Sequence, residues 1–468
     1  MKNRCLKWIS IGLVLSLGLV GCSSSGSDET SEEETTEEST ENIVDENETE
    51  VLEDETDAAE EDAESSEEDS TNSSYGDAVE ITFWYANSQD YVPDAAERFN
   101  ESVGAEEGIV VTVENQGDYS DTHQKLQAAY IAGTAPEMCV VEISSIRRFA
   151  ESGMIIDLED YAEEFDVDLD DYYEGFMENC YVDGTLYAIP FLRSTSIMYM
   201  NNDLIEEAGY DPDAMDTWDD VIEAATAVYE TTGSYGMTYW CGDAWIWEAF
   251  MLSYGEFTVN DDETECTVDG EATRTIINMF LDLEDLGVAH ILQSADTDNF
   301  YSDIMTGNTA FFWTSTGGLT TMLDYAEAAG YELGTAFIPA GTQHGCTTGG
   351  CNIVISNGLS EEKEHAAKTF LNWLTSEEET VAANIWTGYL TTRKSAADDE
   401  EMVALYEESP QFKVALDQLE YAQGRPSNTG YAELETEINN ALDLIWNGAD
   451  IDSTLADLTV KGNELLNE

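Results

Sequence analysis

Basic residues are scarce in this chain, which has 16 Lys and Arg against 100 Asp and Glu among 468 residues, for a formal net charge of −84. Proteins bind a phosphate backbone through Lys and Arg that displace its counterions, so a surface this acidic repels nucleic acid. We therefore expect no nucleic-acid partner. Runs of like charge usually form a solvated face, and we interpret the acidic surplus in that way.

The local motifs of the common enzyme classes are also missing. The chain has no Gly-x-Ser-x-Gly elbow, no His-Glu-x-x-His, no glycine-rich phosphate loop with Lys and no Cys/His zinc spacing. Its four histidines are scattered at positions 123, 290, 344 and 365, so we expect neither a metal nor another cofactor. A surface-anchored glycoside hydrolase is the alternative to a protein without catalytic activity, because 76 Asp and Glu follow position 77 and a suitably spaced pair could lie among them.

No apolar run is long enough to cross a bilayer, since a spanning helix needs about 20 apolar residues. An uncharged stretch at residues 8–20 follows Lys2, Arg4 and Lys7, which is the layout of a signal peptide. It ends in Leu-Val-Gly-Cys at residues 19–22, which resembles the bacterial lipobox. The resemblance implies a signal peptide at 1–21, diacylglyceryl and palmitate groups on Cys22, and anchoring to the extracellular face of the cell membrane. An ordinary secretory cleavage site beside a chance cysteine is the alternative.

Residues 22–77 form an acidic, Ser- and Glu-rich segment, with 24 Asp or Glu and no Lys or Arg between positions 23 and 77. A segment of this composition cannot bury a hydrophobic core, and we expect a disordered linker. As a flexible coil it would span on the order of 40 Å, and self-repulsion would extend it further. It would therefore act as a spacer behind the anchor.

Six cysteines remain after Cys22, and their spacing resembles no disulfide framework; they are Cys139, Cys180, Cys241, Cys266, Cys346 and Cys351. Export permits disulfides without requiring them. Cys346 and Cys351, separated by four residues in a Gly- and Thr-rich segment, are the pair expected to bond if any do.

About 390 residues follow the linker, more than one hydrophobic core usually serves, so we expect two domains. Hydrophobic alternation and capping signals predict strands at 79–85, 109–113, 138–141 and 197–200. Helices are predicted at 93–103, 120–133, 144–153, 203–208, 218–231, 361–373, 377–386 and 431–446. Strands that alternate with helices predict an α/β fold with a mainly parallel sheet, whose ligands gather at the carboxyl ends of the strands.

Several short segments occur in a fixed order: 124–136, 137–142, 158–161, 186–191, 193–195, 198–202, 207–209, 217–219 and 387–390. In this order and spacing they resemble the family 1 extracellular solute-binding proteins, the receptors of ABC importers, over essentially all of residues 78–468. The resemblance implies a monomer with a two-lobed periplasmic-binding-protein-like fold of type II. Lobe 1 would hold 78–191 plus 318–378, and lobe 2 would hold 192–317 plus 379–468. The lobes would close about hinge strands around a solute.

A sugar receptor needs flat aromatic rings for the C–H faces of its ligand and hydrogen-bonding groups for the hydroxyls. The sequence offers aromatic residues at strand ends and in turns, namely Trp84, Tyr85, Tyr119, Trp240, Trp245, Trp247 and Trp313. A turn interrupts the cluster at 240–247, which favours a binding loop. Packing in the core is the alternative for each ring.

By resemblance to glycerol-phosphate and oligosaccharide receptors, we expect ligand contacts at Tyr119, Glu142, Arg193 or Ser194, Trp245, Ser315, Gly350 and Tyr389, with Trp84 and Trp240 added for their rings. Glu142 would accept hydroxyl donors, Arg193 would offer a planar fork, and Gly350 would let backbone amides approach. The alternatives are a solvated strand end for Glu142, hinge packing for Tyr389 and an ion pair for Arg193.

The sequence departs from the glycerol-phosphate receptors at two positions. Those receptors carry a serine where Arg193 stands, and their C-terminal arginine has no secure match here, Arg425 being only nearby. A neutral mono- or oligosaccharide is therefore favoured over a phosphate ester, and the aromatic surplus favours more than one ring. We expect a sugar-binding lipoprotein that is not an enzyme and hands its solute to ABC permease subunits. A sensory or adhesive module without a transporter would differ only in its partner.

Overall fold

The computed structural model describes residues 78–87 and 91–467, all of which belong to one compact unit, Asn72–Glu468. The predicted signal peptide at 1–21, the lipid anchor at Cys22 and the linker at 22–77 lie outside the described residues. Within the two described ranges, none of the helices combines the length and the apolar character that a membrane crossing requires.

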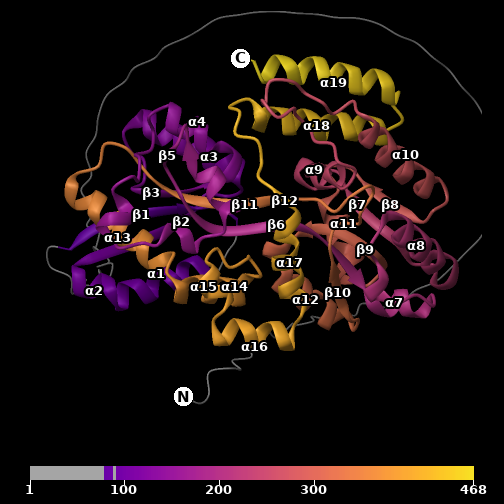
Figure 1. Ribbon diagram of the computed structural model, residues 1–468, viewed down its shortest axis with the longest axis horizontal. Helices are drawn as coiled ribbons and strands as arrows, with labels where there is room; N and C mark the ends of the chain where they lie inside the picture. The colour runs from indigo at the N-terminus through magenta and orange to yellow at the C-terminus, as the bar shows by residue number, and fades with distance from the viewer. Residues whose placement is uncertain (1–77, 88–90, 468) are drawn as a thin grey trace, which may run out of the picture. The chain divides into compact units, whose positions relative to one another are not determined.

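A ten-stranded sheet runs through this unit in the order β2-β1-β3-β11-β6-β9-β7-β8, with β10 paired to β6 and β12 paired to β11 (Figure 1). At one end, β1 (Val79–Tyr85) is parallel to both β2 (Ile109–Asn115) and β3 (Met138–Glu142). At the other end, β7 (Tyr235–Trp240) is parallel to both β8 (Ala289–Leu292) and β9 (Thr309–Ser315). Both ends thus have the parallel pairing that alternating strands and helices predict.

Two long antiparallel strands, β6 (Ile189–Asn201) and β11 (Cys346–Ile355), join the two ends of the sheet. The first half of β6 pairs with β11, and its second half pairs with β9 and with β10 (Leu333–Ala336). On its other side β11 pairs with β3. A β-bulge between Gly350 and Asn352 interrupts the pairing of β6 with β11. These strands are the connections expected of a hinged fold.

The first lobe, as the structure has it, packs around β1, β2 and β3. Its main helices are α1 (Tyr91–Glu101), α3 (Tyr119–Ala132), α4 (Ile146–Glu151) and α13 (Glu361–Leu374). In its core, Phe370 packs edge to face against both Phe83 and Phe99, and all three side chains are completely buried.

The second lobe packs around β7, β8, β9 and β10. Its main helices are α8 (Trp218–Thr232), α9 (Ala244–Ser253), α10 (Glu271–Asp285), α18 (Tyr431–Trp446) and α19 (Ile451–Leu465). Trp218, Phe250 and Trp313 form an aromatic cluster in its core, with ring centroids 5.2–5.4 Å apart. The sheet therefore carries a separate core at each end, as two lobes require.

Shorter elements complete the described chain. They are α2 (Val103–Glu107), α5 (Tyr161–Glu164), α6 (Glu174–Met177), β4 (Tyr181–Val182), β5 (Thr185–Leu186), α7 (Asn202–Glu207), α11 (Thr297–Met305), α12 (Leu319–Ala329), α14 (Glu377–Thr387), α15 (Lys394–Ala397), α16 (Glu400–Glu408), α17 (Gln411–Asp417) and β12 (Ala422–Gln423).

The expected lobe boundaries stay predictions, and the packing of the described chain departs from them near residues 318–336 and at α14. The expected lobe 1 includes residues 318–378, but α12 contacts α11 and β10 pairs with β6, so both pack with the second lobe. The chain returns to the first lobe only along β11. An apolar helix such as α12 carries no sequence signal that says which of two neighbouring cores it joins.

Cys346 and Cys351, the pair favoured if any disulfide forms, are not bonded to each other, because all six cysteines in the described part of the chain are free and buried. Both residues lie on β11. Five residues of extended strand span roughly 16 Å, whereas a disulfide needs Cα atoms within about 7 Å. The segment that looked like a Gly-rich loop is a strand, and that places the two thiols out of reach of each other.

Candidate functional site

A cavity of about 470 Å³ lies between the two lobes. The first lobe lines it with Tyr119, Ser120, His123, Gln124, Gln127, Glu142, Ser145 and Arg148, and the second lobe with Asp243, Ala244, Arg425, Ala432, Glu433, Glu435, Thr436 and Asn439. These residues come from the first half of α3, the end of β3 with the start of α4, the start of α9 with its cap, the segment between β12 and α18, and α18. A larger cavity of about 610 Å³ is lined by second-lobe residues, among them Gln423, Gly424 and Pro426. The first lobe contributes nothing to that larger cavity, so lobe closure would not enclose its contents.

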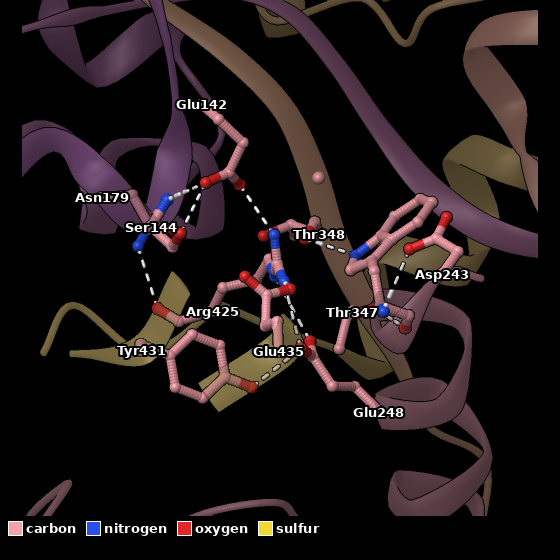
Figure 2. A network of polar contacts seen from close by, with 12 residues as sticks. Glu142, Ser144, Asn179, Asp243, Glu248, Thr347, Thr348, Arg425, Tyr431 and Glu435 are labelled. Atoms are coloured by element: carbon pink, nitrogen blue, oxygen red, sulfur yellow. Dashed lines mark hydrogen bonds and ion pairs between the residues drawn. The ribbon is translucent and has the colours of Figure 1, made fainter. Parts of the chain in front are cut away.

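Arg425 lies at the centre of the cavity wall, between Glu142 and Glu248 (Figure 2). Its Nη1 donates to Oε1 of Glu142 over 2.8 Å, which joins the second lobe to the end of β3. Its Nε and Nη2 donate to the two carboxylate oxygens of Glu248 over 3.3 and 3.0 Å. Nη2 also forms an ion pair with Glu435 on α18. One guanidinium therefore holds three carboxylates from both lobes.

Glu248 is completely buried on α9. The hydroxyl of Tyr431 donates to its Oε1 over 2.7 Å, so each of the two oxygens has a partner. Burial raises the pKa of Glu248, although Arg425 opposes the shift. For Arg425, burial lowers the pKa, but the carboxylates of Glu248 and Glu142 raise it more, so the guanidinium stays charged.

Asp243 lines the cavity and adds a fourth carboxylate near Arg425. It caps α9, where its Oδ1 accepts the backbone N–H of Trp245 over 3.1 Å. Burial raises the pKa of Asp243 to about 6, against the opposing effect of Arg425. Near neutral pH the wall around Arg425 therefore carries more negative than positive charge.

The first-lobe side of the cavity is organised around Glu142. Its Oε2 accepts the backbone N–H of Ser144 over 3.0 Å, and its own N–H donates to Nε2 of His123 over 3.2 Å. Burial lowers the pKa of His123 to about 4, so the ring is neutral at pH 7 and its Nε2 can accept. Arg148 pairs with Glu433 of α18 over 3.1 Å, a second ion pair between the lobes.

Asn439 has free hydrogen-bonding capacity at the cavity. Its Nδ2 donates to the carbonyl of Gly242 over 3.1 Å. Its Oδ1 is buried and has no hydrogen-bond partner within the described ranges. Buried polar atoms are nearly always satisfied, so this unpaired oxygen can gain a partner when the side chain turns toward a ligand in the cavity.

Tyr119 and Glu142 are the predicted site residues that line the cavity. Tyr119 interacts with the hydroxyl of Tyr389 and the thiol of Cys351, and burial raises its pKa well above the ordinary value. The Tyr389 ring lies against Gly317, beside Ser315, whose hydroxyl accepts the N–H of Gly317 over 3.0 Å. Tyr119, Ser315 and Tyr389 thus form one connected group that extends from the cavity toward the joining strands.

Trp245, Ser194 and Gly350 lie around the joining strands. Gly349 lies between the Trp245 ring and the hydroxyl of Ser194. The indole N–H of Trp245 donates to the carbonyl of Thr348 over 3.0 Å. Gly350 has φ +92°, and a Cβ there would lie 1.9 Å from the carbonyl oxygen of Leu192. These positions stay predictions as ligand contacts.

Arg193 is completely buried between β6 and β11 and does not line the cavity. Its guanidinium donates to the carbonyls of Gly349 and Phe176 over 3.0 and 2.7 Å. It also donates to the side chains of Asn352 and Thr348, each over 3.3 Å. Arg193 as a ligand contact stays a prediction, and among the described residues its guanidinium is held by these uncharged acceptors rather than by a carboxylate. Arg193 cross-links the joining strands.

Trp84 and Trp240 do not line the cavity either. The indole of Trp84 donates to Glu114 over 2.8 Å, and that of Trp240 donates to the carbonyl of Ser294 over 3.2 Å. Trp247 and Trp313 are buried in the core of the second lobe. Tyr119 is the aromatic side chain among the residues that line this cavity.

Sequence reasoning missed Asp243, Glu248, Glu435 and Asn439, and it left Arg425 unassigned. The sequence did contain a signal for Arg425. Only 13 Lys and Arg follow residue 77, so each of them is a candidate for a buried cation held by several acidic partners. The acidic residues themselves carry no such signal among 100 Asp and Glu.

A family model described as bacterial extracellular solute-binding protein matches residues 94–414. The sn-glycerol-3-phosphate-binding periplasmic protein UgpB of Escherichia coli K12 is 24% identical over 419 residues, which cover 82% of this chain and 92% of the relative. The arabinooligosaccharide-binding protein of Halalkalibacterium halodurans is 26% identical over 322 residues, covering 66% and 70% of the two chains.

Solved structures confirm the predicted α/β fold with two lobes of type II. UgpB of Mycobacterium tuberculosis in complex with glycerophosphocholine superposes with a TM-score of 0.74 at 25% identity, covering 83% of this chain and 99% of that one. The GacH receptor of Streptomyces glaucescens, solved with acarbose, gives a TM-score of 0.74 at 21% identity, covering 84% and 99%. Each of these relatives is a binding protein.

Proposed function

Because the chain belongs to the bacterial extracellular solute-binding proteins, we propose that it captures a carbohydrate between its lobes and delivers it to the permease of an ABC importer. The solute is a neutral mono- or oligosaccharide. The protein carries out no chemistry on it.

The cavity shared by both lobes is the observation that carries this proposal. Its lining combines hydroxyl, amide and carboxylate groups, which can pair with the hydroxyl rim of a sugar. Tyr119 supplies an aromatic face beside Glu142, and Asn439 supplies an open acceptor from the opposite lobe. A solute that bonds to both lobes at once favours their closure.

The similarity to the arabinooligosaccharide-binding protein and to GacH supports a saccharide as the solute. The relatives that are named for glycerol phosphate bind a different chemical class. The ion pairs of Arg425 favour a saccharide over a phosphate ester, because its positive charge is already paired with Glu142, Glu248 and Glu435.

We also propose that the mature chain is a monomer, anchored through lipid on Cys22 to the extracellular face of the membrane. A receptor without catalytic residues acts only by delivery, and tethering raises its effective concentration at the permease. Mass spectrometry of the mature N-terminus tests the anchor. An unmodified Cys22 would contradict it.

A panel of mono- and oligosaccharides in a thermal-shift assay tests the capture of sugar. A ligand that binds only the folded state adds about 2.7 kcal/mol of stability at a hundredfold excess over Kd, which raises the melting temperature. No shift with any sugar would contradict the proposal. Release of reducing ends from an oligosaccharide would contradict the absence of catalysis.

A pair of variants tests whether the sugar occupies this cavity. Asn439→Ala removes the open acceptor and is expected to weaken binding by about tenfold, as the loss of one hydrogen bond in a buried site does. Asn440→Ala is the matched control, because Asn440 is the exposed neighbour on the same helix and lies outside the cavity. Equal affinities for the two variants would place the sugar elsewhere.

A further inference from the structure

The donors of Arg425 are almost fully used by protein groups. A guanidinium has five N–H groups, and four of them point to carboxylates: two to Glu248, one to Glu142 and one to Glu435. A phosphate or a carboxylate on a ligand is usually held by two parallel N–H bonds from one arginine. One remaining N–H cannot make that bidentate contact.

The charges around Arg425 also oppose an anion. Three carboxylates share one guanidinium, and Asp243 lies close enough to interact with both Arg425 and Glu248. The other cation of the cavity, Arg148, is engaged by Glu433. A phosphate ester that entered would meet an excess of negative charge in a partly desolvated space, where like charges repel strongly.

From this arrangement we infer that Glu248 and Glu435 determine the specificity of the site. They keep the charge of Arg425 neutralised and its donors occupied, so phosphorylated and other anionic solutes are rejected and the cavity accepts an uncharged saccharide. The inference rests on the proposed function and deepens it, because it names the residues that choose between two classes of solute. Glu142 completes the set from the other lobe.

Glu435 is the residue through which this inference is best tested. Its side chain is 20% exposed and forms an ion pair with Arg425, so Glu435→Gln keeps the shape of the site and removes one charge. Glu248 is less suitable because it is completely buried and also accepts from Tyr431. Glu437→Gln is the matched control, since Glu437 lies on the same helix, carries the same charge and does not line the cavity.

Calorimetric titration of the mature chain with sn-glycerol 3-phosphate, and separately with inorganic phosphate, measures the effect. The wild type and Glu437→Gln are expected to bind neither probe measurably. Glu435→Gln removes one of the three carboxylates that neutralise Arg425 and is expected to bind glycerol phosphate at least about tenfold more tightly than the wild type. Equal behaviour of the Glu435→Gln and Glu437→Gln variants would overturn the inference, as would glycerol phosphate binding by the wild type.

A second variant covers the case in which Glu435→Gln does not fold, as judged by circular dichroism. Glu142→Gln removes a carboxylate of Arg425 from the first lobe and is expected to produce the same gain of phosphate-ester binding. No gain in either folded variant overturns the inference. The sugar panel on the wild type tests the proposed function separately. A wild type that binds no sugar contradicts the proposed function, whereas the phosphate-ester affinities of the variants can still be compared.

Discussion

The imidazole of His123 accepts a hydrogen bond from the backbone N–H of Glu142, with 3.2 Å between the two nitrogens. This contact ties the second turn of α3 to the last residue of β3, directly beside the carboxylate that meets Arg425. It requires an unprotonated Nε2. The geometry of the cavity wall is therefore linked to the protonation of one histidine.

The first prediction concerns His123 and the stability of the protein at acidic pH. Burial lowers the folded pKa of His123 to about 4, below its ordinary value of 6.5, so the unfolded chain binds the proton more tightly between these values. The contribution of His123 to stability is present above pH 6.5 and is lost as the pH falls toward 4. His123→Gln should remove about 1–3 kcal/mol of this pH dependence in urea denaturation at pH 7 and pH 4.5. An unchanged pH dependence in the variant would contradict the assignment.

The second prediction concerns Arg193 and stability. Arg193→Ala leaves a cavity and several buried acceptors without a donor, and it should lower the free energy of unfolding by about 3–5 kcal/mol. Arg274→Ala is the control, because Arg274 forms an exposed ion pair with Asp452 and such pairs contribute about 0–1 kcal/mol. Chemical denaturation of both variants measures the difference. Similar losses would mean that Arg193 does not cross-link the strands.

The third prediction separates two costs at Gly350. Gly350→Ala combines a left-handed backbone with a Cβ 1.9 Å from the carbonyl oxygen of Leu192, and it should cost more than about 4 kcal/mol. Gly209 has nearly the same φ, +89°, but a Cβ there meets nothing within 4 Å. Gly209→Ala should therefore show only the backbone cost, about 1–2 kcal/mol. Comparable losses of stability would show that the close approach of β11 to β6 is not what requires glycine.

The fourth prediction concerns the thiols. In a chain that lacks residues 1–22, a thiol reagent should find six free cysteines after denaturation and almost none in the native state, because all six are buried. Burial also raises their pKa values, to about 12 for Cys180 and about 11 for Cys351, which lowers the reactive thiolate fraction. Fewer than six thiols under denaturing, non-reducing conditions would reveal a disulfide.

Local signals predicted much of the fold because they act within a few residues. Asp118 begins α3 by accepting the backbone N–H of Asp121, and Gly133 ends it with φ +72°. Thr217 and Asp220 form a capping box at the start of α8. The expected fold class is confirmed by the solved structures of the family. These features depend on short-range hydrogen bonds, which a sequence displays directly.

Long-range features could not be read in the same way. Only residues 197–200 of β6 were expected as a strand, yet the strand begins at Ile189 and is buried along its whole length. A strand buried on both faces lacks the alternation that marks a strand at a surface. The thiol pair in β11 was misread for a related reason, since glycine and threonine residues suggested a loop.

The site was predicted only in part. Tyr119 and Glu142 line the cavity, and both were expected there from the ligand contacts of the family's receptors. The tryptophans were less informative, since a ring at a strand end can face a core or a ligand, and Trp245 lies against the joining strands. Arg425 is brought to Glu142 from 283 positions away, and such a pairing leaves no local trace.

The bulge between Gly350 and Asn352 gives the joining strands a place where they can bend. A bulge changes the local twist while the ladder on either side keeps its hydrogen bonds. A few degrees of rotation there are magnified with distance, so the outer rims of the lobes travel farther than any group in the cavity. A partner that touches only those rims can thus sense whether the cavity is filled without ever meeting the solute.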